Sequence, residues 1–203
     1  MNIIIRKAAI RSSLFLNYEF EQKDFDQNNL NKVSSDAPIH DDLRACFRKL
    51  IPHFAFLCEQ VTDTDLVESA LTRPESYLED REHSVTEEFF KYYVGSVDIV
   101  EKKGLHYVTL SGNRLLHSGE PLSLTAPAVD MEGSKYIFIS AFINDIENLK
   151  REVLAYMEGK HAEKSQLEMF DSEEKEEEEH TEELKAPKSK GPKGKKNNEA
   201  FVE

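Results

Sequence analysis

The charge of this chain is concentrated at its carboxyl end, in two blocks of opposite sign. Residues 171–183 contain nine acidic side chains and one lysine, and residues 185–196 contain six lysines and no acid. Long runs of like charge repel each other, and the prolines and glycines among the lysines interrupt any helix. We therefore expect this end to be disordered, which leaves about 160 residues for a hydrophobic core, enough for one ordinary domain.

The chain is accordingly predicted to have three parts. They are a domain over residues 1–160, a linker over residues 161–171, and a disordered tail over residues 172–203 that is first acidic and then basic. Residues 1–162 contain 18 cationic and 26 acidic side chains, so they carry −8 of the chain's net charge of −13. The predicted domain is therefore itself acidic.

Apolar runs are too short for a membrane protein. Residues 50–58 form the longest run, which Pro52 and His53 interrupt, whereas a bilayer span needs about 20 apolar residues. At the amino end, residues 3–5 are apolar but are followed at once by two cations, unlike a secretory signal. We expect a protein of the cytoplasm, or of the host cytoplasm if a phage encodes it, with no membrane association and with Cys46 and Cys58 reduced.

Alternating apolar residues predict strands over residues 3–10 and 13–20, which would form an opening hairpin. Residues 22–38 are polar and rich in Asn and Ser, so we predict a loop there. Residues 89–100, a Lys-Gly turn at 103–104 and residues 105–110 predict a second hairpin, which residues 115–126 extend into a meander of three or four strands.

Two helices are predicted. The first begins at residues 40–42 and should kink or break at Pro52, and the second begins at Asn144 as a cap with Glu147 three residues on, and ends at Gly159. Their apolar stripes are Leu43, Phe47, Leu50, Phe54, Leu57 and Val61, then Ile146, Leu149, Val153 and Tyr156 or Met157. The predicted fold class is α+β, an antiparallel sheet with two main helices and a charged tail.

One short peptide resembles a known binding motif. Gln166-Leu167-Glu168-Met169-Phe170 is similar to the peptide by which proteins bind the bacterial sliding clamp. In that resemblance Gln166 binds at the pocket rim, Leu167 and Met169 fill apolar subsites, and Phe170 is the aromatic anchor. The alternative is that Leu167 and Phe170 only extend the last helix onto the core.

A nucleic-acid interface needs cations interleaved with stacking aromatic rings. The predicted candidates are Lys91, Tyr93, Lys102, Lys103, Tyr107 and Arg114. Strand tyrosines are more often packing residues, which is the competing interpretation. A second basic group, Arg44, Arg48 and Lys49, lies on the polar side of the first helix, where solvation is the default explanation. No spacing of Cys, His or acidic residues predicts a metal, cofactor or catalytic site.

Several segments together resemble small proteins encoded by tailed bacteriophages and prophages. They are residues 38–54, 108–112, 122–127 and the peptide at 166–170, and the similarity spans about residues 1–171. The resemblance implies a setting in phage DNA metabolism or host takeover, and no catalytic residues.

The leading hypothesis is a non-enzymatic accessory protein of phage DNA replication or recombination, which binds single-stranded DNA and is tethered to a host sliding clamp. The alternative is an acidic DNA mimic or anti-defence inhibitor, whose carboxylates imitate phosphates. Its candidate carboxylates are Asp63, Asp65, Glu68, Glu75, Glu79, Asp80, Glu82, Glu87 and Glu88. A third alternative, a virion structural protein, predicts a defined homo-oligomer.

Overall fold

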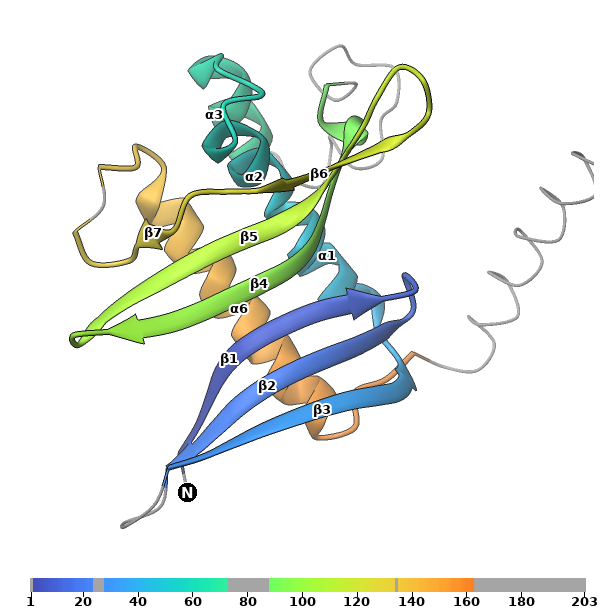
Figure 1. Ribbon diagram of the computed structural model, residues 1–203, viewed down its shortest axis with the longest axis vertical. Coiled ribbons are helices and arrows are strands. Elements are labelled where there is room, and N and C mark those ends of the chain that lie inside the picture. The colour runs from blue at the N-terminus through green and yellow to red at the C-terminus, as the bar shows by residue number, and fades with distance from the viewer. Residues whose placement is uncertain (1, 24–27, 73–87, 134, 163–203) are drawn as a thin grey trace, which may run out of the picture. The chain divides into compact units, whose positions relative to one another are not determined.

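A single antiparallel sheet organises the part of the chain that the structure describes. The computed structural model describes residues 2–23, 28–72, 88–133 and 135–162 (Figure 1). The chain divides into two units, Met1–Glu163 and Lys164–Glu203, and every described residue belongs to the first. The sheet order is β3-β2-β1-β4-β5-β6, and β7 also pairs with β5. The strands are β1 (Asn2–Arg11), β2 (Phe15–Lys23), β3 (Asn28–Pro38), β4 (Tyr92–Lys102), β5 (Leu105–Leu115), β6 (Pro121–Thr125) and β7 (Val129–Asp130).

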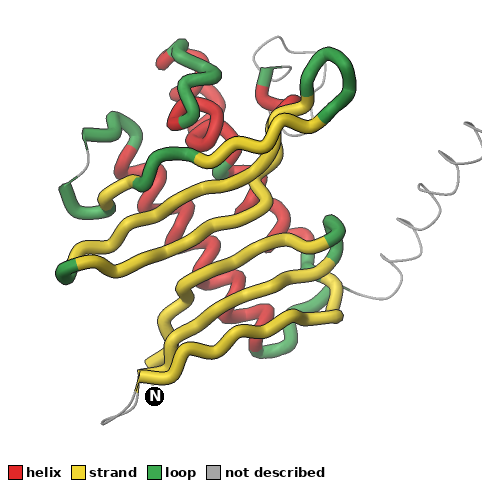
Figure 2. The backbone as a smooth tube through the Cα atoms, in the orientation of Figure 1, coloured by secondary structure: helices red, strands yellow, loops and turns green. Residues whose placement is uncertain are grey.

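The helices cover one face of the sheet. In Figures 1 and 2 the two helices α1 and α6 cross behind the strands, so the viewer looks onto a face that no helix of the described residues covers. We call this the open face. The helices are α1 (Asp41–Lys49), α2 (Ile51–Leu57), α3 (Thr64–Thr72) and α6 (Ile139–Met157), with a short 3-10 helix η1 (Phe89–Lys91) before β4. The predicted α+β class with an antiparallel sheet is confirmed.

The core lies between the sheet and these helices. Leu16, Val97 and Leu110 come from three different strands and are fully buried against them. Both predicted helical stripes face this core, except that Leu57 is only partly buried. The stripe residues that are buried are Leu43, Phe47, Leu50, Phe54, Val61, Ile146, Leu149, Val153 and Tyr156.

The first predicted helix is divided near Pro52, as expected. Leu50 is both the C-cap of α1 and the N-cap of α2. Pro52 lies in the first turn of α2, where its missing N–H costs no helical hydrogen bond. His40 caps the start of α1, because its Nδ1 accepts a hydrogen bond from the Asp42 N–H at 3.2 Å. The interruption lets one continuous apolar stripe follow two short helices.

The start predicted for the last helix was wrong. Helix α6 begins at Ile139, five residues before Asn144, which lies inside it. The reason is tertiary packing: Phe142 in the added turn is fully buried, and Phe138 packs edge-on against Phe56 of α2, with ring centroids 5.4 Å apart. A capping pattern inside a helix is overridden when the preceding turn buries large aromatic rings. At the other end Gly159 (φ 105°) follows the helix, as predicted.

The loop predicted over residues 22–38 was also wrong at residues 22–23, which end β2, and from residue 28 onward. This segment is β3, an edge strand that pairs with β2 from Asn28 opposite Lys23 to Pro38 opposite Phe15. Its side chains are largely exposed, so no apolar alternation marked it in the sequence. Backbone pairing along the neighbouring strand is what forms β3, and this depends little on side-chain hydrophobicity.

The predicted central hairpin and meander are confirmed as β4, β5 and β6. The hairpin turn uses Lys103 (φ 54°) and Gly104 (φ 79°), and two consecutive positive φ values suit a tight two-residue turn. Gly112 on β5 has no room for a side chain, because a Cβ atom there would lie 1.9 Å from the carbonyl oxygen of Tyr93. This close approach accompanies a bulge in β4 between Val94 and Ser96.

The sheet consists of two halves that meet along a short seam. Strands β1 and β4 pair only at Lys7–Asp98, Ala8–Val97 and Ala9–Ser96, and they diverge on either side of these pairs, as Figure 1 shows. Pairing is far longer within each half, along β1–β2–β3 and along β4–β5. The seam therefore joins the two halves through three residue pairs.

Candidate functional site

The six predicted nucleic-acid residues do not form one site. Lys102 and Lys103 lie at the tip of the β4–β5 hairpin, and Tyr107 pairs with Val100 near that tip. Tyr93, in contrast, lies at the opposite end of the same ladder, about 30 Å away at 3.3 Å per residue. These residues all lie near one hairpin in the sequence, but the long ladder separates them in space.

Two of the six residues take part in contacts that hold the fold. Arg114 donates a hydrogen bond of 2.6 Å from Nη1 to Gln60, and its guanidinium lies 5.7 Å from the ring centre of Tyr92. Tyr92 is buried and pairs with Arg114, so both side chains are on the helix side of the sheet. Lys91 forms an ion pair with Glu88 at 3.2 Å.

The structure instead brings Tyr93 close to a cation of the second basic group. Tyr93 alternates with the buried Tyr92 and Val94, so it points to the open side, and it is 40% exposed. It lies where the seam opens, and Arg44 of α1 is near enough for its charge to lower the pKa of the Tyr93 hydroxyl, although burial raises this pKa more strongly. Tyr93 is therefore a partly exposed ring that the charge of Arg44 influences.

A second ring and arginine lie at the same end of the sheet. The guanidinium of Arg11 is 5.3 Å from the ring centre of Phe15, which it opposes in the β1–β2 ladder. Arg11 also binds Asp36 of β3 at 2.6 Å. Because Arg11 and Tyr93 both lie beyond the Ala9–Ser96 pair on neighbouring strands, we group Arg11, Phe15, Arg44 and Tyr93 as the aromatic corner.

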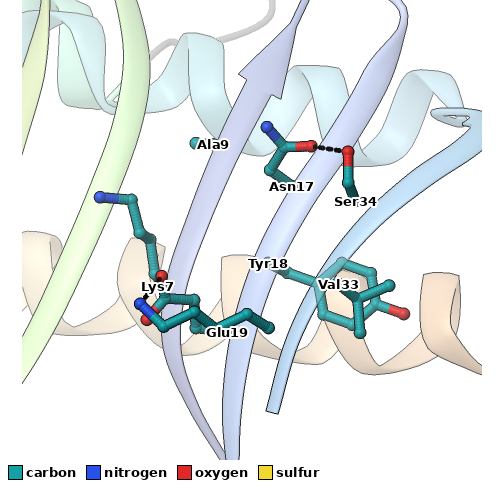
Figure 3. Close-up of a pocket in the computed structure, with 8 residues that line it drawn as sticks. Lys7, Ala9, Asn17, Tyr18, Glu19, Val33 and Ser34 are labelled. Carbon is teal, nitrogen blue, oxygen red and sulfur yellow. Dashed lines mark hydrogen bonds and ion pairs between the residues drawn. The ribbon is translucent and has the colours of Figure 1, made fainter.

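Next to this corner, a row of small uncharged side chains crosses the open face. Successive pairings align one residue from each of six strands, and only Ala9 among them lacks a polar group. Figure 3 shows three of these residues in line, with the Ser34 hydroxyl donating to the Asn17 amide oxygen at 2.8 Å. This polar row is Ser34, Asn17, Ala9, Ser96, Ser111 and Thr125.

The next row carries alternating charge. Following the same pairings from β3 to β4, it has a cation, an anion, a cation and an anion. Lys32 pairs with Glu19 at 2.9 Å, and Lys7 pairs with Asp98 at 2.7 Å. We call Lys32, Glu19, Lys7 and Asp98 the charged row.

Arg6 holds the two halves of the sheet together beside the charged row. It is the bulged residue of β1 and binds both Glu21 of β2 and Glu101 of β4, the latter at 3.1 Å. The hydrogen bond from Arg6 holds the pKa of Glu101 below its usual range. One open depression of about 320 Å³ lies over the polar and charged rows of β1 to β3 (Figure 3), and another of about 370 Å³ lies at the seam around Arg6.

Sequence reasoning missed a buried polar chain on the covered side. His53 of α2 is fully buried, its Nδ1 lies 2.7 Å from the Tyr136 hydroxyl, and its Nε2 lies 3.3 Å from a carboxylate oxygen of Asp145 on α6. Burial and the nearby Asp145 raise the pKa of Tyr136. Only the position of His53 among apolar residues could have signalled a satisfied core histidine.

Other predicted residues lie outside the described part of the chain. Gln166, Leu167, Met169 and Phe170 of the clamp-like peptide are among them, as are Glu75, Glu79, Asp80, Glu82 and Glu87 of the candidate mimic surface. Of the remaining carboxylates, Asp63 caps α3 by accepting hydrogen bonds from the N–H groups of Asp65 and Leu66, and Glu88 pairs with Lys91.

The described residues define a class of protein by their architecture: a one-sided α+β sheet with a polar and charged open face. Within these residues there is no cluster of three or more His, Cys, Asp or Glu side chains that could hold a metal ion, and both cysteines are free. No helix in the described ranges is long and apolar enough to cross a membrane. Comparison with protein-family models, curated proteins and solved structures found no match.

Proposed function

We propose that this protein is a non-enzymatic accessory factor of phage DNA replication or recombination that binds single-stranded DNA at the aromatic corner of its open face. The observation that carries the proposal is the placement of two rings, Phe15 under the guanidinium of Arg11 and the 40% exposed Tyr93, on a face that no described helix covers. Single-strand binding proteins combine cations that follow the backbone with rings on which bases stack.

The polar row gives the strand a path away from the corner. Six strands at about 4.8 Å spacing make the row about 24 Å long, and its hydroxyl and amide groups can hydrogen-bond to exposed base edges. The side chains of the polar row are small, so they leave room for the strand above the sheet, and the charged row runs along one side. Binding of this kind reads little sequence, because every base has a stacking face.

The negative charge that would repel DNA is smaller on the described residues than on the whole chain. The described residues contain 16 cationic and 19 acidic side chains, a net of −3, against −13 for the full chain. The carboxylates that hold Arg11, Lys7 and Lys32 must nevertheless compete with phosphates. We expect modest affinity that falls steeply as salt is added.

The peptide at residues 166–170 would add a second, independent contact. In the proposal Phe170 and Leu167 bind a bacterial sliding clamp while the domain holds the single strand. Linking two modest interactions through one chain raises the overall affinity when both sites can be occupied together. The proposal therefore assigns the tether to the linker and the DNA contact to the domain.

Fluorescence anisotropy tests the DNA contact. The full chain is titrated into labelled oligo(dT) of about 20 nucleotides at roughly 50 and 200 mM salt. Tyr93→Ala should weaken binding about 5- to 100-fold, the effect of losing one stacked base. Phe90→Ala, which removes another exposed ring only three residues away on η1, is the matched control and should have little effect.

Absence of binding at the lower salt would exclude the DNA contact, as would equal losses for the two variants. If the same protein instead inhibits a nuclease without binding DNA, the mimic alternative replaces the proposal.

A separate titration tests the clamp contact. The full chain is titrated against a purified bacterial sliding clamp, and Phe170→Ala should abolish binding, because aromatic anchors dominate such small interfaces. Phe201→Ala removes the other phenylalanine beyond residue 163 and should leave affinity unchanged. Clamp binding that survives Phe170→Ala would show that this peptide is not the tether.

A further inference from the structure

The charged row of the open face is complementary to itself. Read from β3 to β4, its signs are plus, minus, plus, minus, from Lys32, Glu19, Lys7 and Asp98. Such a row meets its own reversed copy with opposite signs at every position. We infer that the open face of the β1–β2–β3 half-sheet and β4 is the interface of a two-fold homodimer, with the charged row of one copy packed on the charged row of the partner.

The symmetry of the row selects one axis. A two-fold axis that runs parallel to the strands, between β1 and β2, places β2 over the partner's β1 and β3 over the partner's β4. Glu19 then faces the partner's Lys7, and Lys32 faces the partner's Asp98. An axis along the row would instead place each charge on its own copy, Lys7 on Lys7, which is unfavourable.

The rows on either side of the charged row fit the same axis. Leu30 of β3 is 56% exposed and Val100 of β4 is 45% exposed, and both line the depression at the seam. The axis places Leu30 against the partner's Val100, so two exposed aliphatic side chains cover each other. On the other side Ser34 meets the partner's Ser96, and Asn17 meets the partner's Ala9, which lets the two sheets approach closely. The dimer covers this part of the polar row, so a DNA strand bound there and a second copy of the chain exclude each other.

The charged side chains are exposed enough to contact the partner copy while keeping their ion pairs within the chain. Lys32 is 68% exposed and Lys7 is 38% exposed even though each already has an acidic partner within its own chain. In the dimer each intrachain pair becomes part of a four-charge cluster across the interface. Such clusters fix orientation and partner choice more than they add affinity.

The size of the face indicates a weak dimer. Four strands of about 4.8 Å spacing and nine to eleven residues cover roughly 19 by 30 Å, or about 600 Å² per copy. Stable complexes bury about 800 Å² per partner, so we expect a dissociation constant in the micromolar range that rises with salt. Because the axis is parallel to the strands, both aromatic corners lie at the same end of the dimer.

Charge variants in two sets test the interface. The all-acidic variant Lys7→Glu, Lys32→Glu and the all-basic variant Glu19→Lys, Asp98→Lys should each be monomeric, with self-affinity reduced at least about a hundredfold, because like charges then meet across the axis. A one-to-one mixture of the two should form a heterodimer. Sedimentation velocity of the full chain from about 1 to 300 µM measures all three, with circular dichroism to confirm folding.

A second variant tests the aliphatic contact beside the charged row. Leu30→Asp should abolish the wild-type dimer, whereas Ile137→Asp, at an equally exposed aliphatic residue outside the sheet, should leave it intact. A wild-type chain that stays monomeric over this range would overturn the inference, and so would a dimer that tolerates the all-acidic variant or Leu30→Asp. These measurements contain no DNA, so their failure leaves the proposed DNA contact to its own test.

Discussion

The two faces of the sheet are built from alternate residues of the same strands and have opposite physical character. On β4, Val97 is fully buried against the helices, and its neighbours Ser96 and Asp98 lie on the open face. On β2, Leu16 is buried while Asn17 and Glu19 are not. One period-two pattern therefore supplies both the core and the candidate binding surface.

The comparison separates what stabilises this fold from what can recognise a partner. Burial of a large apolar side chain contributes about 1.5–3 kcal/mol, whereas an exposed ion pair contributes about 0–1 kcal/mol. The ion pairs of the open face can therefore be rearranged at little cost to stability. Substitutions on the two faces should differ accordingly.

The largest difference is expected for phenylalanines. Phe54 of α2 is fully buried, and Phe54→Ala should lower the free energy of unfolding by about 3–5 kcal/mol through lost burial and a residual cavity. Phe90 is 47% exposed, so Phe90→Ala should change it by less than about 1 kcal/mol. Urea denaturation measures both values, and comparable losses would contradict the assignment of Phe54 to the core.

Histidines provide the next comparison. His53→Ala should cost about 2–4 kcal/mol, because the buried Tyr136 hydroxyl and the Asp145 carboxylate each lose a hydrogen bond to the imidazole. His106 lies near Glu132 with a half-exposed side chain, and His106→Ala should have little effect. Both variants are measured by urea denaturation at neutral pH. A small cost for His53→Ala would show that the polar chain does not stabilise the core.

The buried thiol predicts a dependence on alkaline pH. Burial raises the pKa of Cys46 to about 11 from an ordinary value of 9.0. The folded state disfavours the thiolate, so this contribution to stability is complete below pH 9 and is lost as the pH rises toward 11. The stability advantage of wild type over Cys46→Ala should therefore shrink by about 1.4 kcal/mol between pH 8 and 10, at about that amount per pKa unit.

Urea unfolding at the two pH values measures this change, with Cys58→Ala as the control at the less buried thiol. An advantage that stays constant with pH would mean that Cys46 titrates normally.

The smallest effect is expected on the open face. A double-mutant cycle over Lys32→Ala and Glu19→Ala should give a coupling of about 0.2–1 kcal/mol for the exposed pair. This value should decrease in high salt. A coupling above about 2 kcal/mol, measured at low protein concentration, would mean that the open face contributes to stability as the covered face does.

Most elements could be predicted from the sequence because they carry strong local patterns. The opening hairpin, the break near Pro52, the Lys103-Gly104 turn and the apolar stripe of α6 all follow from spacing or turn chemistry. Strand β3 could not, since its exposed polar residues show no apolar alternation and its pairing with β2 supplies the missing stabilisation. The start of α6 was missed because Phe138 and Phe142 pack on residues far away in the sequence.

Two residues of the aromatic corner stand out in the sequence. Tyr93 and Arg44 were each singled out, but as members of different groups, and Lys102, Lys103 and Tyr107 proved to lie at the other end of the ladder. Arg11 and Phe15 were not recognised, although a cation opposite a ring across a predicted hairpin was a usable signal. Distance along a ladder cannot be read from composition alone.

Sequence by itself determined the α+β class of the fold, because the period of two in strands and of 3.6 in helices depends only on the spacing of nearby residues. It also separated the charged end from the part able to form a core. Only the tertiary structure decided that β4 lies beside β1, which sets Asp98 against Lys7 across 91 positions of the chain. The physical reason is that β1 and β4 are joined by no turn, so their order and register depend on which faces are buried together in the whole sheet. The polar row, the charged row and the aromatic corner exist only once that packing is in place.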